Sequence, residues 1–180
     1  MRGLVDEERL RRFMRALGAE ADAPVRVYFA GGATAVLHGW RRSTIDVDLV
    51  FAPESDRIFR ALPRLKEELG INVEIASPAH FLPELPGWEA RSPYIGREGQ
   101  ADFFHYDPYA QALAKIERGH RQDRGDVEEL IGRGLVELAE LLRLFAAIEP
   151  RLHRFPAVDA KALRRAVEDI AGRTTRAEPR

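Results

Sequence analysis

The chain has 180 residues, of which 45% are hydrophobic and 32% charged, so it holds enough apolar material for about one domain with a well-solvated surface. Its net charge of −1 gives no argument for a general electrostatic attraction to nucleic acid. The absence of cysteine excludes disulfides and thiolate metal sites, which fits a reducing cytoplasm. No segment approaches the roughly 18 consecutive apolar residues of a membrane span, and the N-terminus does not have the pattern of a signal peptide.

Apolar periodicity predicts an α+β fold with a small mixed β-sheet and flanking helices. The first part of the chain alternates helical and extended patterns, and Gly31-Gly32 separates the first strand from a short helix. Pro63 is expected to kink or divide the third helix. The predicted elements are a helix over 6–19 that stops at Gly18, a strand over 25–30, a helix over 33–40, a strand over 45–51, a helix over 53–70 and a strand over 71–76.

The second part of the chain is predicted to be helical. Residues 77–93 contain four prolines and indicate a loop, and residues 94–107 indicate a hairpin that turns near Glu98-Gly99. Two units are expected, an αβ core over 1–107 and a helical region over 108–180 packed on it. The predicted helices cover 108–119, 123–134, 135–155 with an interruption at Pro150, and 158–173.

Asp46 and Asp48 are the first candidate functional residues. They alternate with Ile45, Val47 and Leu49, so the two carboxylates are expected on one face of the strand, about 7 Å apart at Cα. Ionised carboxylates that approach within about 4 Å repel by several kcal/mol at an effective dielectric near 20. Solvent, an arginine or a divalent cation would offset this repulsion, and the pair alone leaves these three alternatives open.

The preceding Gly31-Gly32 turn favours the cation. Glycines at a strand-to-helix turn let the backbone approach a phosphate closely, which would then lie over the carboxylate face of the next strand. Oxygen-only ligands suit Mg²⁺ or Mn²⁺, which commonly bridge carboxylates to substrate phosphates. A third carboxylate is expected from a neighbouring strand, and Glu74 is the candidate, although it is also explained as an outward-facing residue of an edge strand.

These residues form an ordered pattern that resembles the DNA polymerase β-like minimal nucleotidyltransferase superfamily. The signature of that superfamily is Gly-Gly or Gly-Ser, a spacer of about a dozen residues, and Asp-x-Asp or Asp-x-Glu. Thirteen residues separate Gly32 from Asp46 here. The residues that carry the resemblance are Gly31, Gly32, Arg42, Thr44, Asp46 and Asp48.

A second pattern lies in the helical region. Lys115, Arg118, Asp123 and Asp126 resemble the Lys…Arg…Asp-x-x-Asp motif of the abortive-infection nucleotidyltransferase toxins and their uncharacterised prokaryotic relatives. The two resemblances together span residues 25 to 130. A plain salt-bridged helix pair explains these four residues about as well, and each exposed bridge would then contribute only about 0.2–1 kcal/mol.

The resemblance implies a role for each matched residue. Asp46 and Asp48 would coordinate the metal, and Glu74 would complete the set as base or third ligand. Lys115 would neutralise phosphate charge, and Asp126 would orient Lys115 or Arg118. Nucleotide binding would involve Gly31, Gly32, Arg42, Thr44, Arg118, Asp123 and Asp126.

The implied activity is metal-dependent transfer of a nucleoside monophosphate from an NTP to an acceptor hydroxyl, with release of pyrophosphate. Mg²⁺ or Mn²⁺ is the implied cofactor, and the relatives suggest a tRNA 3′ end, a protein or a small molecule as the acceptor. The alternative is a non-catalytic protein on the same fold that binds the partner protein of a toxin–antitoxin pair. Residues Arg118, His120, Arg121 and Arg124 supply a local basic segment for a nucleic acid.

Overall fold

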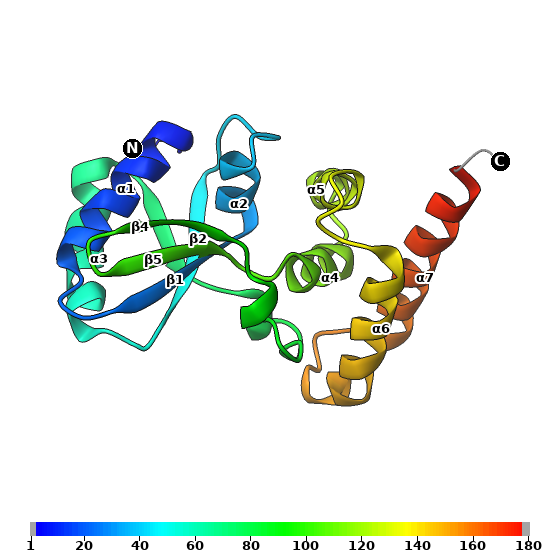
Figure 1. Cartoon of the computed structure of the whole chain (residues 1–180). Coiled ribbons are helices and arrows are strands. Elements are labelled where there is room, and N and C mark those ends of the chain that lie inside the picture. The colour runs from blue at the N-terminus through cyan, green and yellow to red at the C-terminus, as the bar shows by residue number, and fades with distance from the viewer. Residues whose placement is uncertain (1–2, 178–180) are drawn as a thin grey trace. The chain divides into compact units, whose positions relative to one another are not determined.

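The computed structural model describes residues 3–177, with the backbone alone for 173–177 (Figure 1). The chain divides into two compact units. Unit 1 contains the residues up to Ser77 together with Ser92–Tyr106, and unit 2 contains Pro78–Arg91 and the residues from Asp107 on. The loop over residues 78–91 therefore groups with the helices, whereas the sequence placed it in the αβ core.

Unit 1 contains a five-stranded sheet and three helices, which gives the α+β fold that the sequence predicts. The strand order is β3-β2-β1-β5-β4, and the sheet is mixed because β1 pairs antiparallel with β2 and parallel with β5. The elements are α1 (Glu7–Glu20), β1 (Val25–Ala30), α2 (Gly31–Leu37), β2 (Asp46–Ala52), α3 (Asp56–Leu69), β3 (Asn72–Ile75), β4 (Tyr94–Glu98) and β5 (Ala101–His105).

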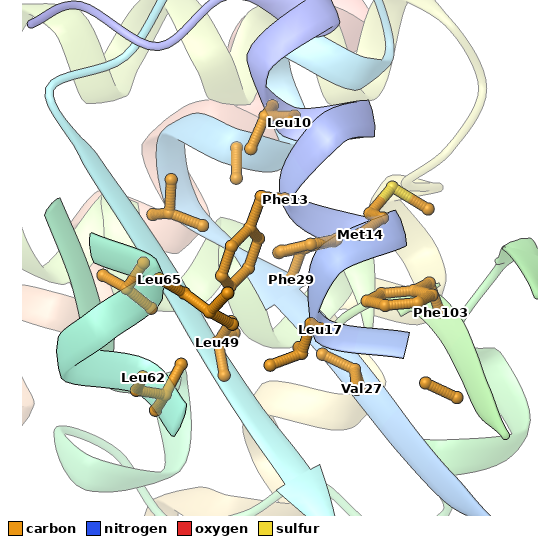
Figure 2. Close-up of a cluster of buried hydrophobic side chains, with 14 of the residues drawn as sticks. Leu10, Phe13, Met14, Leu17, Val27, Phe29, Leu49, Leu62, Leu65 and Phe103 are labelled. Atoms are coloured by element: carbon orange, nitrogen blue, oxygen red, sulfur yellow. The ribbon is translucent and has the colours of Figure 1, made fainter. Parts of the chain in front are cut away.

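The core of unit 1 lies between one face of the sheet and its helices. Alternate strand residues, among them Val27, Phe29 and Leu49, point toward α1 and α3 and are fully buried. Figure 2 shows Phe13 of α1 and Leu65 of α3 in the same cluster of buried side chains. Because every second strand residue is used in this way, the opposite face of the sheet carries the remaining side chains, and these include the candidate carboxylates.

Three expectations about unit 1 are wrong in detail. Gly18 does not end the first helix but lies inside α1, where a Cβ would clash with the backbone of Glu98. Ile45 is 69% exposed and precedes β2, because the chain bends there before it enters the sheet. Pro63 does not divide α3, which runs unbroken to Leu69 and is capped by Ser55 and by left-handed Gly70.

Unit 2 is built around α4 (Pro108–Arg118), which contacts α6, α7 and the neighbouring α5. Asp107 caps α4 and is fully buried, and its carboxylate binds Arg91 at 2.6 Å. This ion pair attaches the loop over 78–91 to the helices. The other elements are η1 (Pro78–His80), η2 (Glu89–Arg91), α5 (Arg121–Gly132), α6 (Leu138–Ile148), η3 (Glu149–Arg154) and α7 (Ala160–Ala177).

The helices of the described residues do not include one that is both long enough and apolar enough to cross a membrane.

Candidate active site

Asp46 and Asp48 lie on the face of the sheet opposite the core. Val47 and Leu49, which alternate with them, are fully buried beneath the sheet, while both aspartates are half-buried. Asp48 is the register partner of Ala30 on β1, so a small side chain lies beside it. The strand therefore presents two carboxylates in one direction next to the end of β1, as the alternation predicts.

The Gly31-Gly32 turn lies directly against Asp48. Gly31 has a φ of +59°, a conformation that favours glycine, and a Cβ there would lie 2.5 Å from Oδ2 of Asp48. The helix α2 begins at Gly31 itself, two residues earlier than the sequence suggests. The backbone of the turn and the carboxylate of Asp48 are thus in contact only because Gly31 lacks a side chain.

Thr44 fixes the segment that leads from α2 to β2. Its hydroxyl donates a hydrogen bond to the backbone oxygen of Asp46 at 3.0 Å, and its side chain packs so closely on Gly32 that a Cβ there would clash. Backbone bonds in both directions join Thr44 to Val5. Thr44 therefore sets the start of β2, whereas Arg42 is exposed on the same segment. Phosphate contacts by Arg42 or Thr44 stay a prediction.

Glu74 lies on the same face as the two aspartates. In the parallel pairing of β2 with β3, Asp46 lies opposite Asn72 and Asp48 opposite Glu74. The amide nitrogen of Asn72 donates to Oδ1 of Asp46 at 2.7 Å and to Oε1 of Glu74 at 3.2 Å. The sheet thus brings the three predicted carboxylates to one face, with an asparagine between two of them.

The donor set suits a hard cation. Among residues 3–172, whose side chains the structure describes, no three His, Cys, Asp or Glu side chains are grouped closely enough to hold a metal ion. Mg²⁺ in nucleotide enzymes usually takes one or two carboxylates and completes its shell with water and substrate phosphates. Asp46 and Asp48 fit that requirement, and Glu74 as the third metal ligand stays a prediction.

A histidine stack joins the C-terminal end of α2 to the end of β5. His105 of β5 is 7% exposed, and its ring stacks on that of His38 with the centroids 3.9 Å apart. Nδ1 of His105 lies 3.4 Å from the hydroxyl of Thr34, which donates to the backbone oxygen of Phe29. His105 follows Ala101 and Phe103 onto the buried face of β5. Burial, with smaller contributions from His38 and Arg11, lowers the pKa of His105 to about 3.

Lys115, Arg118, Asp123 and Asp126 come together in unit 2. Nζ of Lys115 lies 2.6 Å from Asp126 and 3.5 Å from Asp123, and Arg118 makes two hydrogen bonds to Asp123 at 2.8 and 2.5 Å. Lys115 is only 6% exposed and both aspartates 3%, so these are not the exposed bridges that the sequence suggested. The cluster joins α4 to α5. A direct role for Lys115, Arg118, Asp123 or Asp126 in nucleotide binding stays a prediction.

Asp123 accepts hydrogen bonds from both cations of this cluster. Burial by itself would raise the pKa of Asp123, but the hydrogen bonds from Arg118 and the positive charges of Lys115 and Arg118 outweigh it and hold the pKa below its usual value. The two cations and two carboxylates balance in charge. The arrangement is therefore an ion network with three buried members and the exposed Arg118, in which the donors are directed at the two acids.

The fold and the acidic face together indicate the class of protein to which the chain belongs. A glycine turn after the central strand, with paired carboxylates on the adjacent strand, is the arrangement that the nucleotidyltransferase signature requires. The model of the family described as "Nucleotidyltransferase of unknown function (DUF6036)" matches residues 8–174, nearly the whole chain, and the protein belongs to this family. No curated protein and no solved structure matches the chain. The narrower resemblance to abortive-infection toxins stays a prediction.

Asn72 is the site residue that the sequence reasoning missed. It precedes Glu74 by two positions, so the alternation that places Glu74 on the acidic face also places Asn72 there. That signal was present in the sequence. What the sequence did not contain is the register of β3 on β2, which sets Asn72 opposite Asp46 and so between two carboxylates.

Proposed function

We propose that the protein transfers a nucleoside monophosphate from an NTP to an acceptor hydroxyl and releases pyrophosphate. The family supports this class of reaction. The observation that carries the proposal is the contact of the Gly31 backbone with Asp48, which lets a triphosphate on the turn and a cation on the carboxylates be neighbours.

Asp46 and Asp48 would hold Mg²⁺ or Mn²⁺. When bound, the ion would neutralise triphosphate charge and lower the pKa of the attacking hydroxyl. The acceptor oxygen forms a bond to the α-phosphorus, and the bond from that phosphorus to the oxygen bridging to the β-phosphate breaks, so that pyrophosphate leaves. Glu74, on the same face and exposed, would take the hydroxyl proton.

The acceptor is proposed to be a tRNA 3′ end, a protein or a small molecule. A net charge of −1 does not favour a broad nucleic-acid surface, so an RNA acceptor would have to be bound by local contacts. The relevant assay therefore offers all three kinds of acceptor to the same preparation and lets the labelled product identify the acceptor.

The test uses the full chain with each of four α-labelled NTPs, Mg²⁺ or Mn²⁺, and total tRNA or a lysate. Label should move to an acceptor with one NTP, and pyrophosphate should appear in equal amount. Asp46→Asn and Asp48→Asn should lower transfer by about 100-fold or more, because charge stabilisation at the reacting phosphate is lost. Asp22→Asn, at an exposed aspartate before β1, should leave transfer unchanged.

One result would decide against catalysis. If the folded protein binds an NTP in calorimetry with Mg²⁺ but transfers label from none of the four, the transferase proposal fails. The protein would then be a nucleotide-binding member of its family without turnover, as the partner-protein alternative requires.

A further inference from the structure

Asn72 occupies a special position at the acidic face. It is the only asparagine in the chain, and it lies on the edge strand β3 directly opposite Asp46. Its amide is placed between the carboxylates of Asp46 and Glu74, at 2.7 and 3.2 Å. Only the nitrogen end of an amide donates hydrogen bonds, so it is the end that two carboxylates attract.

We propose that Asn72 is the positioning residue of the metal site, and that Glu74 is held by Asn72 and does not bind the metal. This inference rests on the proposed function, because it assumes a divalent cation at Asp46 and Asp48. The short bond fixes Oδ1 of Asp46, and within the described residues no other hydrogen bond is made to this carboxylate. Oδ2 of Asp46 is thereby the oxygen left for a cation.

The same amide accounts for the arrangement of Glu74. The Glu74 carboxylate accepts a hydrogen bond from Asn72 at 3.2 Å, so it leans along β3 toward Asn72. The three acids accordingly share a face without assembling into a three-ligand group among residues 3–172. A neutral donor between Asp46 and Glu74 also reduces the repulsion between their charges.

Asn72 and Glu74 are therefore expected to have separable effects. Loss of the amide frees Asp46 to rotate and should weaken metal binding, as the loss of partners that orient metal ligands does, by about 10- to 100-fold. Loss of the Glu74 charge should leave metal binding nearly intact and lower transfer, because the proposed role of Glu74 is to take a proton.

The experiment measures Mn²⁺ binding to the full chain by electron paramagnetic resonance, without nucleotide and without turnover. The variants are Asn72→Leu, the smaller Asn72→Ala, Glu74→Gln and Asp48→Asn, with the fold of each checked by circular dichroism. Both Asn72 variants should bind Mn²⁺ about 10- to 100-fold more weakly. Glu74→Gln should bind Mn²⁺ with an affinity much closer to that of the wild type than either Asn72 variant, while its transfer activity falls, because the glutamine amide oxygen still accepts from Asn72 and only the proton acceptor is lost.

The outcomes separate the two proposals. If the wild type binds Mn²⁺ and Asp48→Asn weakens it, but a folded Asn72 variant binds normally, the positioning role of Asn72 is overturned and the metal site stands. A loss in Glu74→Gln as large as that in Asn72→Ala would likewise overturn the inference, because Glu74 would then be a ligand. If the wild type binds no Mn²⁺, both the metal site and the role of Asn72 fail.

Discussion

Gly31, where α2 follows directly on β1, is in contact with Asp48 of the neighbouring strand β2. A Cβ on Gly31 would lie 2.5 Å from Oδ2 of Asp48, and no such approach is possible between real atoms without displacement. The position of the Asp48 carboxylate on β2 therefore depends on the residue at 31 being glycine, because any other side chain would displace it.

Gly31→Ala is expected to weaken Mn²⁺ binding while the protein still folds. Alanine at a φ of +59° costs about 1–2 kcal/mol in the free energy of unfolding, and its methyl group displaces the carboxylate of Asp48. Mn²⁺ affinity should fall by about 10-fold or more, the range for misplaced metal ligands. The measurements are metal binding by electron paramagnetic resonance and stability by urea unfolding.

Gly39→Ala is the matched control for this prediction. Gly39 also has a left-handed backbone, with a φ of +85°, but a Cβ there has nothing within 4 Å. It should therefore lose a similar amount of stability without any change in Mn²⁺ affinity. Equal losses of metal affinity in the two variants would show that backbone strain, and not the contact with Asp48, is responsible.

Gly18→Ala and Gly125→Ala should change stability in opposite directions. Both glycines lie inside helices, α1 and α5, where alanine is favoured by about 1 kcal/mol. A Cβ on Gly18 would overlap the backbone of Glu98, so the first variant should lose about 1–3 kcal/mol net through overpacking. A Cβ on Gly125 meets nothing within 4 Å, so the second should gain stability. Urea unfolding curves test both, and a stable Gly18→Ala would refute the close packing of α1 on the hairpin.

Gly18 and Gly119 show where sequence reasoning fails and where it succeeds. Local signals are sufficient for β1, for the alternation of Asp46 and Asp48, and for Gly119 as the end of α4, because each depends on neighbours in the chain. Gly18 has the same local pattern as a helix stop, yet its reason is a close approach to residue 98. A contact over 80 residues leaves no trace in a local pattern.

The candidate site divides in the same way. The residue types and the shared face of Asp46, Asp48 and Glu74 follow from the period of a β-strand. Asn72 and Asp46 are 26 residues apart in sequence, and the bond between them depends on the register of β3 on β2, which only the fold supplies. The burial of Lys115 is likewise a result of helix packing, and spacing along α4 does not reveal it.

His105 should make the stability of unit 1 fall in mild acid. Burial lowers its pKa to about 3 in the folded protein, against about 6.5 in an unfolded chain. Between these values the unfolded chain binds a proton that the folded protein excludes, so the free energy of unfolding decreases as the pH falls below 6.5. From pH 7.5 to 5.0 this residue should account for about 2 kcal/mol of lost stability.

The measurement compares wild type with His105→Gln by urea unfolding at pH 7.5, 6.0 and 5.0. Trp40 lies in unit 1 and Trp88 in unit 2, so fluorescence in a Trp88→Phe background follows unit 1. The variant should show a flatter pH dependence, whereas His80→Gln, at an exposed histidine, should match the wild type. Identical slopes for all three proteins would mean that His105 takes up its proton in the folded state.

Lys115→Met should destabilise unit 2 by about 3–5 kcal/mol. The lysine is 6% exposed and lies 2.6 Å from Asp126, so its loss leaves a buried carboxylate without its cation. Replacing both partners removes the uncompensated charge, so Lys115→Met with Asp126→Leu should regain most of the lost stability. Urea unfolding followed by Trp88 in a Trp40→Phe background measures the effect on unit 2.

The double variant also decides what the Lys115 cluster does. If the ion pair acts only to hold α4 against α5, nucleotide transfer in the double variant should return along with stability, because no charge from the pair is needed by the substrate. If Lys115 neutralises triphosphate charge, transfer should stay low although the fold is restored. Arg133→Met, which removes an exposed ion pair to Glu129 on α5, is the control and should change stability by no more than about 0.5 kcal/mol.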